Sequence, residues 1–158
     1  MAKLVDARDS KSRGSDTVSV RVRPSAPRKD IFLNGIKMLD SKCIFCKIIK
    51  KEISSKIIKE NDHVIVIEDI HPKAPRHYLI LPKKHVININ HLQEQDFDIV
   101  INMLKIVQEI TKDIQKITNK EVDFNLISNN GASAGQSVFH MHWHFISGKN
   151  LYLDGFKL

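Results

Sequence analysis

The sequence predicts an α+β domain, because helical and strand-like apolar patterns are mixed along it without the βαβ repetition of a parallel sheet. The β-branched run Val64–Ile67 predicts a strand, and histidines alternating with apolar residues over 140–146 predict another. Residues from about Gln93 to Thr118 predict one long helix. Its apolar residues recur at helical spacing on one face: Phe97, Val100, Ile101, Leu104, Val107, Ile110, Ile114 and Ile117.

Local signals predict the shorter elements. Residues 44–51 read as a short helix, with its isoleucines and Phe45 on one face. Residues 57–58, 77–81 and 124–128 read as strands, and Pro82 ends the second of these. Residues 71–75 read as a loop, because two prolines prevent regular pairing.

Length and composition favour one domain of ordinary globular type. The chain has 158 residues, of which 42% are apolar. No run approaches the ~18 apolar residues of a membrane span, and residues 1–37 lack the apolar core of a secretory signal. Two cysteines without such a signal indicate a reducing compartment, so we expect a cytoplasmic protein without a membrane partner.

The net charge of +7 comes mostly from the leader. Residues 1–37 hold nine Lys/Arg and four Asp, whereas residues 38–158 hold 16 Lys/Arg and 14 Asp/Glu. The body therefore lacks the basic stripe of a nucleic-acid binder. We expect the leader to be disordered. Because Val20–Pro24 resembles the spurious translation of a tRNA gene, we expect the natural protein to start at Met38; a genuine disordered basic tail is the alternative.

The histidine-rich run carries the strongest functional signal. His140, His142 and His144 would share one face of a strand and line a pocket, while Met141, Trp143 and Phe145 pack into the core. Imidazole serves near neutral pH as a nucleophile, a proton carrier or a metal ligand.

A loop of small residues leads directly into that run. Gly131 and Gly135 permit positive φ and close approach of a ligand, and Gln136 and Ser137 add an amide and a hydroxyl. Exposed backbone N–H groups in such a loop suit phosphate oxygens, so we expect an anion site there rather than a plain turn.

Cys43 and Cys46 have the C-x-x-C spacing of a zinc site, but one pair supplies only half of the ligands. A redox C-x-x-C is the rival interpretation. It is disfavoured because the strand that precedes a thioredoxin-like motif is missing. Two reduced core cysteines are the third possibility.

These motifs together resemble the histidine-triad (HIT) family of nucleotide hydrolases and transferases. Residues 140–146 fit its His-φ-His-φ-His-φ-φ motif, in which φ is apolar, at every position. Residues 43–49, 68–70, 82–85 and 135–139 resemble the family's other segments, and the Hint-like nucleoside phosphoramidase branch is the most similar. The resemblance implies a HIT domain over residues 38–158. Its fold would be a five-stranded antiparallel sheet with one long and one short helix, extended across a homodimer.

The resemblance also implies residue roles. His142 would attack the α-phosphorus of a purine nucleoside monophosphate derivative and form a covalent intermediate that water hydrolyses. His140, His144 and Ser137 would complete the catalytic group. The implied nucleotide-binding residues are Asp69, Ile70, Asn129, Gly135, Gln136, Ser137, Ile44, Phe45, Ile48 and Ile67. A structural Zn²⁺ would be held by Cys43, Cys46, His85 and His140.

The other four histidines are expected at the surface or in capping positions: His63, His71, His77 and His91. Two alternative functions remain open. One is a catalytic zinc hydrolase that uses the histidines as ligands. The other is a non-catalytic module that binds purine nucleotides or acts as a scaffold.

Overall fold

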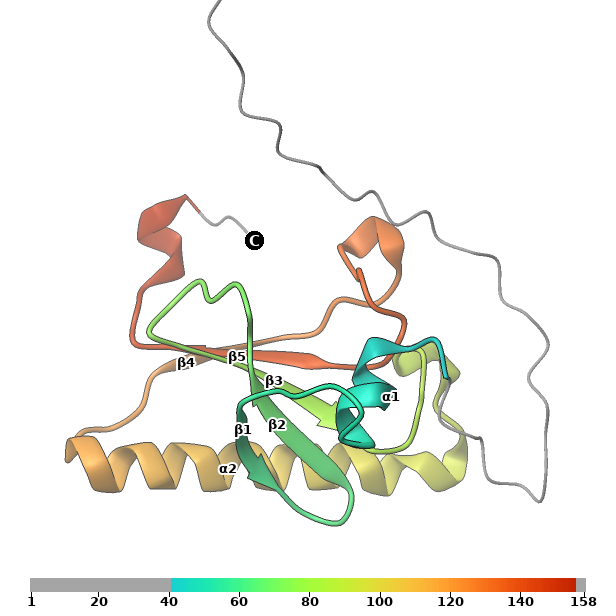
Figure 1. Ribbon diagram of the computed structural model, residues 1–158. Coiled ribbons are helices and arrows are strands. Elements are labelled where there is room, and N and C mark those ends of the chain that lie inside the picture. Colours follow the sequence, from blue (N-terminus) through green and yellow to red (C-terminus); the bar gives the residue numbers. More distant parts are fainter. Residues whose placement is uncertain (1–40, 156–158) are drawn as a thin grey trace, which may run out of the picture.

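A computed structural model describes residues 41–155, so the expectations for residues 1–37 lie outside the described residues. Its centre is a five-stranded antiparallel sheet in the order β1-β2-β3-β5-β4 (Figure 1), which confirms the expected fold class. The strands are β1 (Ile57–Glu60), β2 (Val64–Glu68), β3 (Arg76–Pro82), β4 (Phe124–Ile127) and β5 (Trp143–Ser147).

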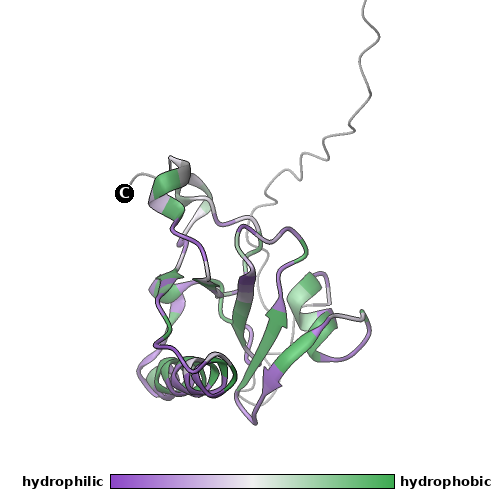
Figure 2. Cartoon of the chain, turned by 90° about the vertical axis from the view of Figure 1, so that its left-hand side faces the viewer, coloured by the Kyte–Doolittle hydropathy of each residue, from purple (hydrophilic) through white to green (hydrophobic). Residues whose placement is uncertain are grey.

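Two helices cover opposite faces of this sheet (Figure 2). They are the short α1 (Ile44–Ile49) and the long α2 (Phe97–Thr118). Short 3₁₀ turns connect the other elements: η1 (Ile89–His91), η2 (Glu94–Asp96), η3 (Ala132–Ala134) and η4 (Leu151–Asp154). Across residues 41–155, no helix is both long and apolar enough to cross a lipid bilayer.

Strand β2 is apolar from Val64 to Ile67 because both of its faces are covered. Val64 and Val66 pack with the buried residues of α2, whereas Ile65 and Ile67 pack with those of α1. Alternate side chains of a strand point to opposite faces, so a strand between two helices carries no polar alternation.

Strand β5 shows the predicted alternation over part of its length. Trp143 and Phe145 pack on the α2 side, as expected. The strand begins at Trp143 rather than at His140, however, and pairs with β3 from Trp143 to Ser147. The ladder between β3 and β5 ends at the pair Ile80–Trp143, two residues before Pro82 ends β3. Residues 140–142 are instead held by the Met141 N–H bond to the carbonyl oxygen of Val86 (2.6 Å).

Helix α2 begins at Phe97, four residues later than predicted, because η2 precedes it. The buried side chain of Asp96 pairs with Lys84 and accepts a hydrogen bond from the Gln93 N–H (3.2 Å). These contacts anchor the start of α2 beside the segment that follows β3.

The apolar residues predicted to share one face of α2 differ in burial, so that prediction is partly wrong. The residues that do face the sheet are Met103, Ile106, Val107, Ile110 and Ile114. Four residues assigned to the same face are 48–82% exposed: Phe97, Ile101, Leu104 and Ile117. Apolar positions spaced by three and four form two stripes on this helix, and spacing alone does not tell which stripe faces the core.

Candidate active site and metal centre

His142 lies buried on the α1 side of the sheet, where the ring of Phe45 meets it edge-on at 5.3 Å. Its Nδ1 lies 2.7 Å from the carbonyl oxygen of His140. A carbonyl can only accept, so Nδ1 carries the proton and the neutral ring has its lone pair on Nε2. Burial lowers the pKa of His142, which favours this neutral form. A neutral imidazole in this tautomer can act as a nucleophile.

His144 makes a close contact with a histidine of the neighbouring strand. Its Nδ1 lies 2.9 Å from Nε2 of His77, which is buried at the start of β3. Asp69 follows β2, and its N–H bond to the carbonyl oxygen of His77 (2.9 Å) brings its carboxylate to the same place. The Asp69 Oδ2 atom lies 3.4 Å from His77 Nε2 and 3.8 Å from His144 Nδ1.

The protons of this histidine pair follow from one backbone contact. The N–H of Lys73 donates to Nδ1 of His77 (3.1 Å), so the neutral His77 ring carries its proton on Nε2. His77 Nε2 therefore donates to Nδ1 of His144, and the neutral His144 ring has its own proton on Nε2. Burial is the largest cause that lowers the pKa of both rings, and it brings that of His144 to about 4.

Asp69, His77 and His144 are close enough together to hold a metal ion. The protonation of His77 argues against it, because the nitrogen that faces the other two residues bears a proton. A metal there would need the bond from Lys73 N–H to be broken. The Lys73 N–H, His77 and His144 thus form a chain of hydrogen bonds with the Asp69 carboxylate beside it, rather than a cation site.

A second cluster joins Cys43, Cys46, His85 and His140, all buried, with ligand atoms within 4.8 Å of one another. Cys46 Sγ lies 3.2 Å from His85 Nδ1 and 3.5 Å from His140 Nδ1, and Cys43 Sγ lies 3.6 Å from His140 Nδ1. Tetrahedral zinc, with Zn–S of about 2.3 Å and Zn–N of about 2.0–2.1 Å, places sulfur and nitrogen ligands about 3.6 Å apart. The cluster could therefore hold a metal ion.

The chemistry of the donor atoms agrees with this spacing. His140 Nε2 donates to the carbonyl oxygen of Pro82 (2.8 Å), so the Nδ1 lone pair is directed toward the sulfurs. The hydrogen bond with Cys46 holds the pKa of the Cys43 thiol far below its ordinary value, although burial opposes this shift. A thiolate is the form that binds metal.

The loop before the triad is held in shape by Gln136. Its buried amide accepts the Gly131 N–H (2.8 Å) and donates to the carbonyl oxygens of Ile87 (2.6 Å) and Val138 (3.1 Å). Gly135 has a φ of 86°, a left-handed conformation that only glycine adopts without strain, and its Cα faces the side chain of Asn129. Ser137 lies exposed after this turn.

The apolar residues that are implied to bind the nucleotide divide into buried and exposed ones. Phe45, Ile48 and Ile67 are buried in the cluster between α1 and the sheet. Ile44 and Ile70 are 46% and 84% exposed. The two exposed side chains are therefore the ones that present free apolar surface.

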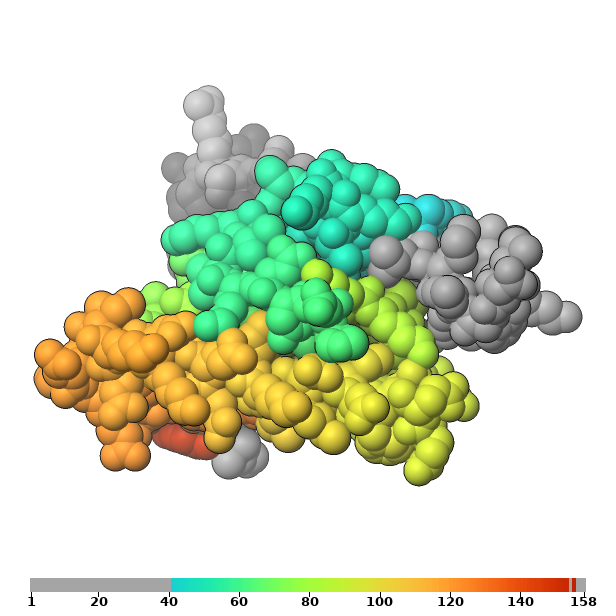
Figure 3. All heavy atoms as spheres, turned by 90° about the horizontal axis from the view of Figure 1, so that it is seen from below, coloured from blue at the N-terminus to red at the C-terminus, as the bar shows by residue number. Residues whose placement is uncertain are grey.

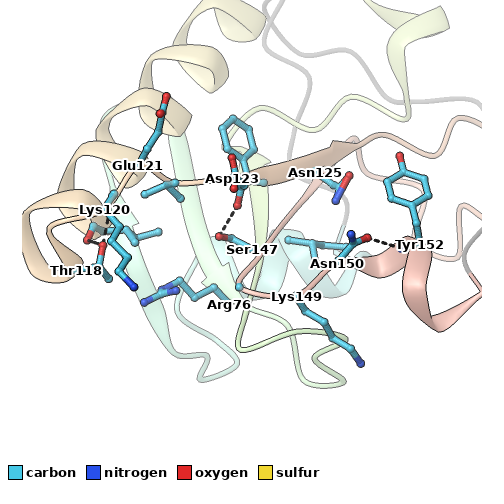
Figure 4. Close-up of a pocket in the computed structure, with 15 residues that line it drawn as sticks. Arg76, Thr118, Lys120, Glu121, Asp123, Asn125, Ser147, Lys149, Asn150 and Tyr152 are labelled. Atoms are coloured by element: carbon cyan, nitrogen blue, oxygen red, sulfur yellow. Dashed lines mark hydrogen bonds between the residues drawn. The ribbon is translucent and has the colours of Figure 1, made fainter.

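A cavity of about 630 Å³ lies elsewhere, beside the end of α2, with Arg76, Lys120, Lys149 and Tyr152 in its wall (Figure 4). Ser147 donates to the carbonyl oxygen of Asp123 there (2.7 Å). None of the triad histidines lines this cavity, so it is separate from the histidine clusters.

A family model described as "Scavenger mRNA decapping enzyme C-term binding" matches residues 42–153. The chain belongs to the histidine-triad (HIT) family. An uncharacterised HIT-like protein of Methanocaldococcus jannaschii is 38% identical over 104 residues, which cover 66% of this chain and 77% of that protein.

Solved structures agree with this assignment. A HIT family hydrolase from Clostridium thermocellum has a TM-score of 0.64 and 41% identity, over 70% of this chain and 94% of that one. A histidine triad protein from Clostridium difficile has a TM-score of 0.65 and 35% identity, over 72% and 96%. This HIT protein thus has the fold of proteins named as hydrolases, which supports an enzymatic role.

The expectation that His77 is a surface or capping residue is wrong, since its side chain is 4% exposed and contacts His144. One feature of the sequence indicated the position of His77. Asp69 ends one predicted strand and His77 begins the next, and only a short loop joins them. Adjacent antiparallel strands place such residues side by side.

Proposed function

We propose that this HIT protein hydrolyses a P–N or acyl-phosphate bond at the α-phosphate of a purine nucleoside monophosphate derivative. The supporting observation is the fixed tautomer of His142, whose Nδ1–H is held by the carbonyl oxygen of His140 (2.7 Å). The Nε2 lone pair attacks the phosphorus and the bond to the leaving group breaks. Water then cleaves the nucleotidyl-histidine intermediate and releases the nucleotide.

His144 supports both steps as a neutral donor. With Nδ1 accepting from His77, the Nε2–H of His144 is free to donate to a phosphate oxygen or to the leaving group. The Ser137 hydroxyl follows the glycine turn and donates to the same groups. A ring with a pKa near 4 stays neutral at pH 7, so it contributes a directed hydrogen bond rather than a full charge.

The nucleotide lies across the α1 side of the sheet in this proposal. Asp69 accepts the ribose hydroxyls, because a carboxylate has acceptor capacity beyond its bond from the His71 N–H (2.8 Å). The Asn129–Ser137 loop binds the phosphate through its N–H groups, while Gln136 keeps that loop in shape. Ile44 and Ile70 border the base, backed by Phe45, Ile48 and Ile67.

Cys43, Cys46, His85 and His140 hold a structural Zn²⁺ in this proposal. When bound, the ion would link α1 to the segment before β5, and with four protein ligands it would leave no position for substrate. The proposed hydrolysis uses His142 and His144, which lie outside this set of four ligands.

We further propose a homodimer formed through α2 and β4. Seen from below, α2 crosses the molecule from one side to the other, next to the region of α1 and β1 (Figure 3). Its exposed Phe97, Ile101 and Leu104 form an apolar stripe, and Phe124 and Leu126 of β4 are 41% and 37% exposed. β4 is also an edge strand, so a second copy could pair with it and continue the sheet.

Release of AMP from adenosine 5′-phosphoramidate tests the activity. His142→Ala should abolish turnover, whereas His63→Ala, at an exposed histidine, should leave it unchanged. Turnover that survives metal chelation supports the nucleophile, while turnover that depends on an added metal would favour a catalytic zinc site. Nucleotide binding without any turnover would instead support a binding or scaffold module.

A further inference from the structure

We propose that Cys43 and Cys46 are a site of reversible oxidation, and that their disulfide releases the metal and disables His142. The disulfide is independent of the proposed hydrolase activity, and the metal release rests only on the proposed zinc site. The loss of turnover rests on that activity.

The two sulfurs are placed for this reaction. Cys43 is the N-cap of α1 and Cys46 lies in its first turn, so one helical turn brings both thiols into the same cluster. Neither is in a disulfide, and they are the only cysteines in the sequence. An intramolecular disulfide can therefore form at this pair alone.

Their exposure gives them different roles. Cys43 is 7% exposed and Cys46 is 0% exposed, so a small oxidant meets Cys43 first. Hydrogen peroxide is small enough to reach a side chain with so little exposed surface. The Cys43 thiolate attacks one peroxide oxygen, the O–O bond breaks, and Cys43 becomes a sulfenic acid as hydroxide leaves. The Cys46 thiolate then attacks the Cys43 sulfur, the S–S bond forms and a second hydroxide leaves.

Oxidation removes the two anionic ligands from the cluster. The two thiolates lose two electrons to one peroxide, and the resulting disulfide sulfurs are neutral. His85 and His140 remain as two neutral ligands, which are too few for a closed zinc site. Reduction by a thiol restores both thiolates and the ability to bind metal.

Two contacts carry this change to the nucleophile. His140 contributes Nδ1 to the cysteine cluster, while its carbonyl oxygen accepts the proton of His142 Nδ1 (2.7 Å). Phe45 lies between the two cysteines in sequence. Its ring centroid lies 5.9 Å from that of His140 and 5.3 Å from that of His142. A shift of residues 43–46 therefore moves a ring and a carbonyl that orient His142.

The test uses the full zinc-loaded chain and one peptide. Trypsin cleavage after Lys42 and Lys47 yields residues 43–47, which contain both cysteines and no methionine. Peroxide should remove two hydrogens from this peptide and release the bound zinc, as followed with a chromogenic chelator. Turnover should fall by ~10-fold or more and should return with a thiol reductant and zinc.

Three results would overturn the proposal. They are zinc retained after peroxide treatment, a peptide 43–47 that gains oxygen instead of losing hydrogen, and metal loss that a reductant does not reverse. Cys43→Asp is the matched variant, because it keeps an anionic ligand but cannot form a disulfide, and its zinc should resist peroxide. If that variant does not fold, the peptide mass of the wild-type protein decides the question, and both readouts hold whether or not the chain is a hydrolase.

Discussion

The Nε2 atom of His77 lies 2.9 Å from the Nδ1 atom of His144, and this contact makes the tautomer of His144 depend on that of His77. The chain of donors starts at the backbone N–H of Lys73, which fixes Nδ1 of His77 as an acceptor. It ends at Nε2 of His144, which bears the proton that a substrate would meet. One backbone amide thus determines the hydrogen bond that His144 offers.

His77→Ala should lower kcat by ~10–100-fold, a typical cost of losing a residue that orients a functional side chain, here that of His144. Without His77, the neutral His144 ring can take the other tautomer and present a lone pair instead of a proton. KM should change little, because no contact with the nucleotide is removed. Steady-state kinetics of AMP release measure both constants.

His77→Gln is the conservative control, since its amide N–H can still donate to His144 Nδ1. It should recover part of the lost kcat. An alanine variant with wild-type kcat would show that the contact plays no part in catalysis.

Stability should depend on pH through the same residues. The pKa of His144 falls from 6.5 to about 4, first because of burial and then because of His142 and His77. The unfolded chain therefore binds more protons than the folded chain between these two values. The free energy of unfolding should fall as the pH drops from about 6.5 to about 4, and this group should contribute no pH dependence above 6.5.

Urea unfolding at a series of pH values measures this dependence. His144→Asn removes the titrating ring, so its stability should fall less steeply over the same window. His63→Ala, at an exposed histidine, should keep the wild-type slope. Equal slopes for His144→Asn and the wild type would contradict the assignment.

The sequence predicted what depends on local pattern. The alternation of Trp143 and Phe145 with histidine predicted their faces correctly, because the two-residue period of a strand is a local property. The cluster of Asp69, His77 and His144 was missed because these residues come from the ends of three strands. Only the order β2-β3-β5 brings them together, across 67 residues in the case of the two histidines.

The tautomers of His77 and His144 were beyond sequence analysis for a related reason. They depend on one backbone atom, the Lys73 nitrogen, and the identity of a side chain says nothing about it. Similarly, the spacing along α2 indicated a helix but did not separate the stripe that contains Met103 from the stripe that contains Leu104.

Gln136→Ala should destabilise the fold by about 1–3 kcal/mol, because it leaves the half-buried Gly131 N–H and Ile87 carbonyl oxygen without their partner. KM should rise as well, since the loop proposed to hold the phosphate loses its support. Urea unfolding and steady-state kinetics measure the two effects. Ser133→Ala, at an exposed position of the same loop, is the control and should change neither value. A Gln136→Ala variant with wild-type stability would show that the loop holds its shape without this amide.

Leu104→Glu should convert the proposed dimer to a monomer. Leu104 is 51% exposed in the middle of α2, and a second copy packed against this stripe would bury the new carboxylate without a partner. Light scattering after size-exclusion chromatography measures the mass directly, with twice the chain mass expected for the wild type.

Ile117→Glu is the matched control, because Ile117 is an 82% exposed isoleucine of the same helix that lies outside the Phe97–Leu104 stripe. It introduces the same charge and should leave the dimer intact. Dissociation by both substitutions would indicate a general effect of charge on α2 rather than a specific interface. A wild-type protein that runs as a monomer would show that the exposed stripe and the β4 edge are not joined by a second copy.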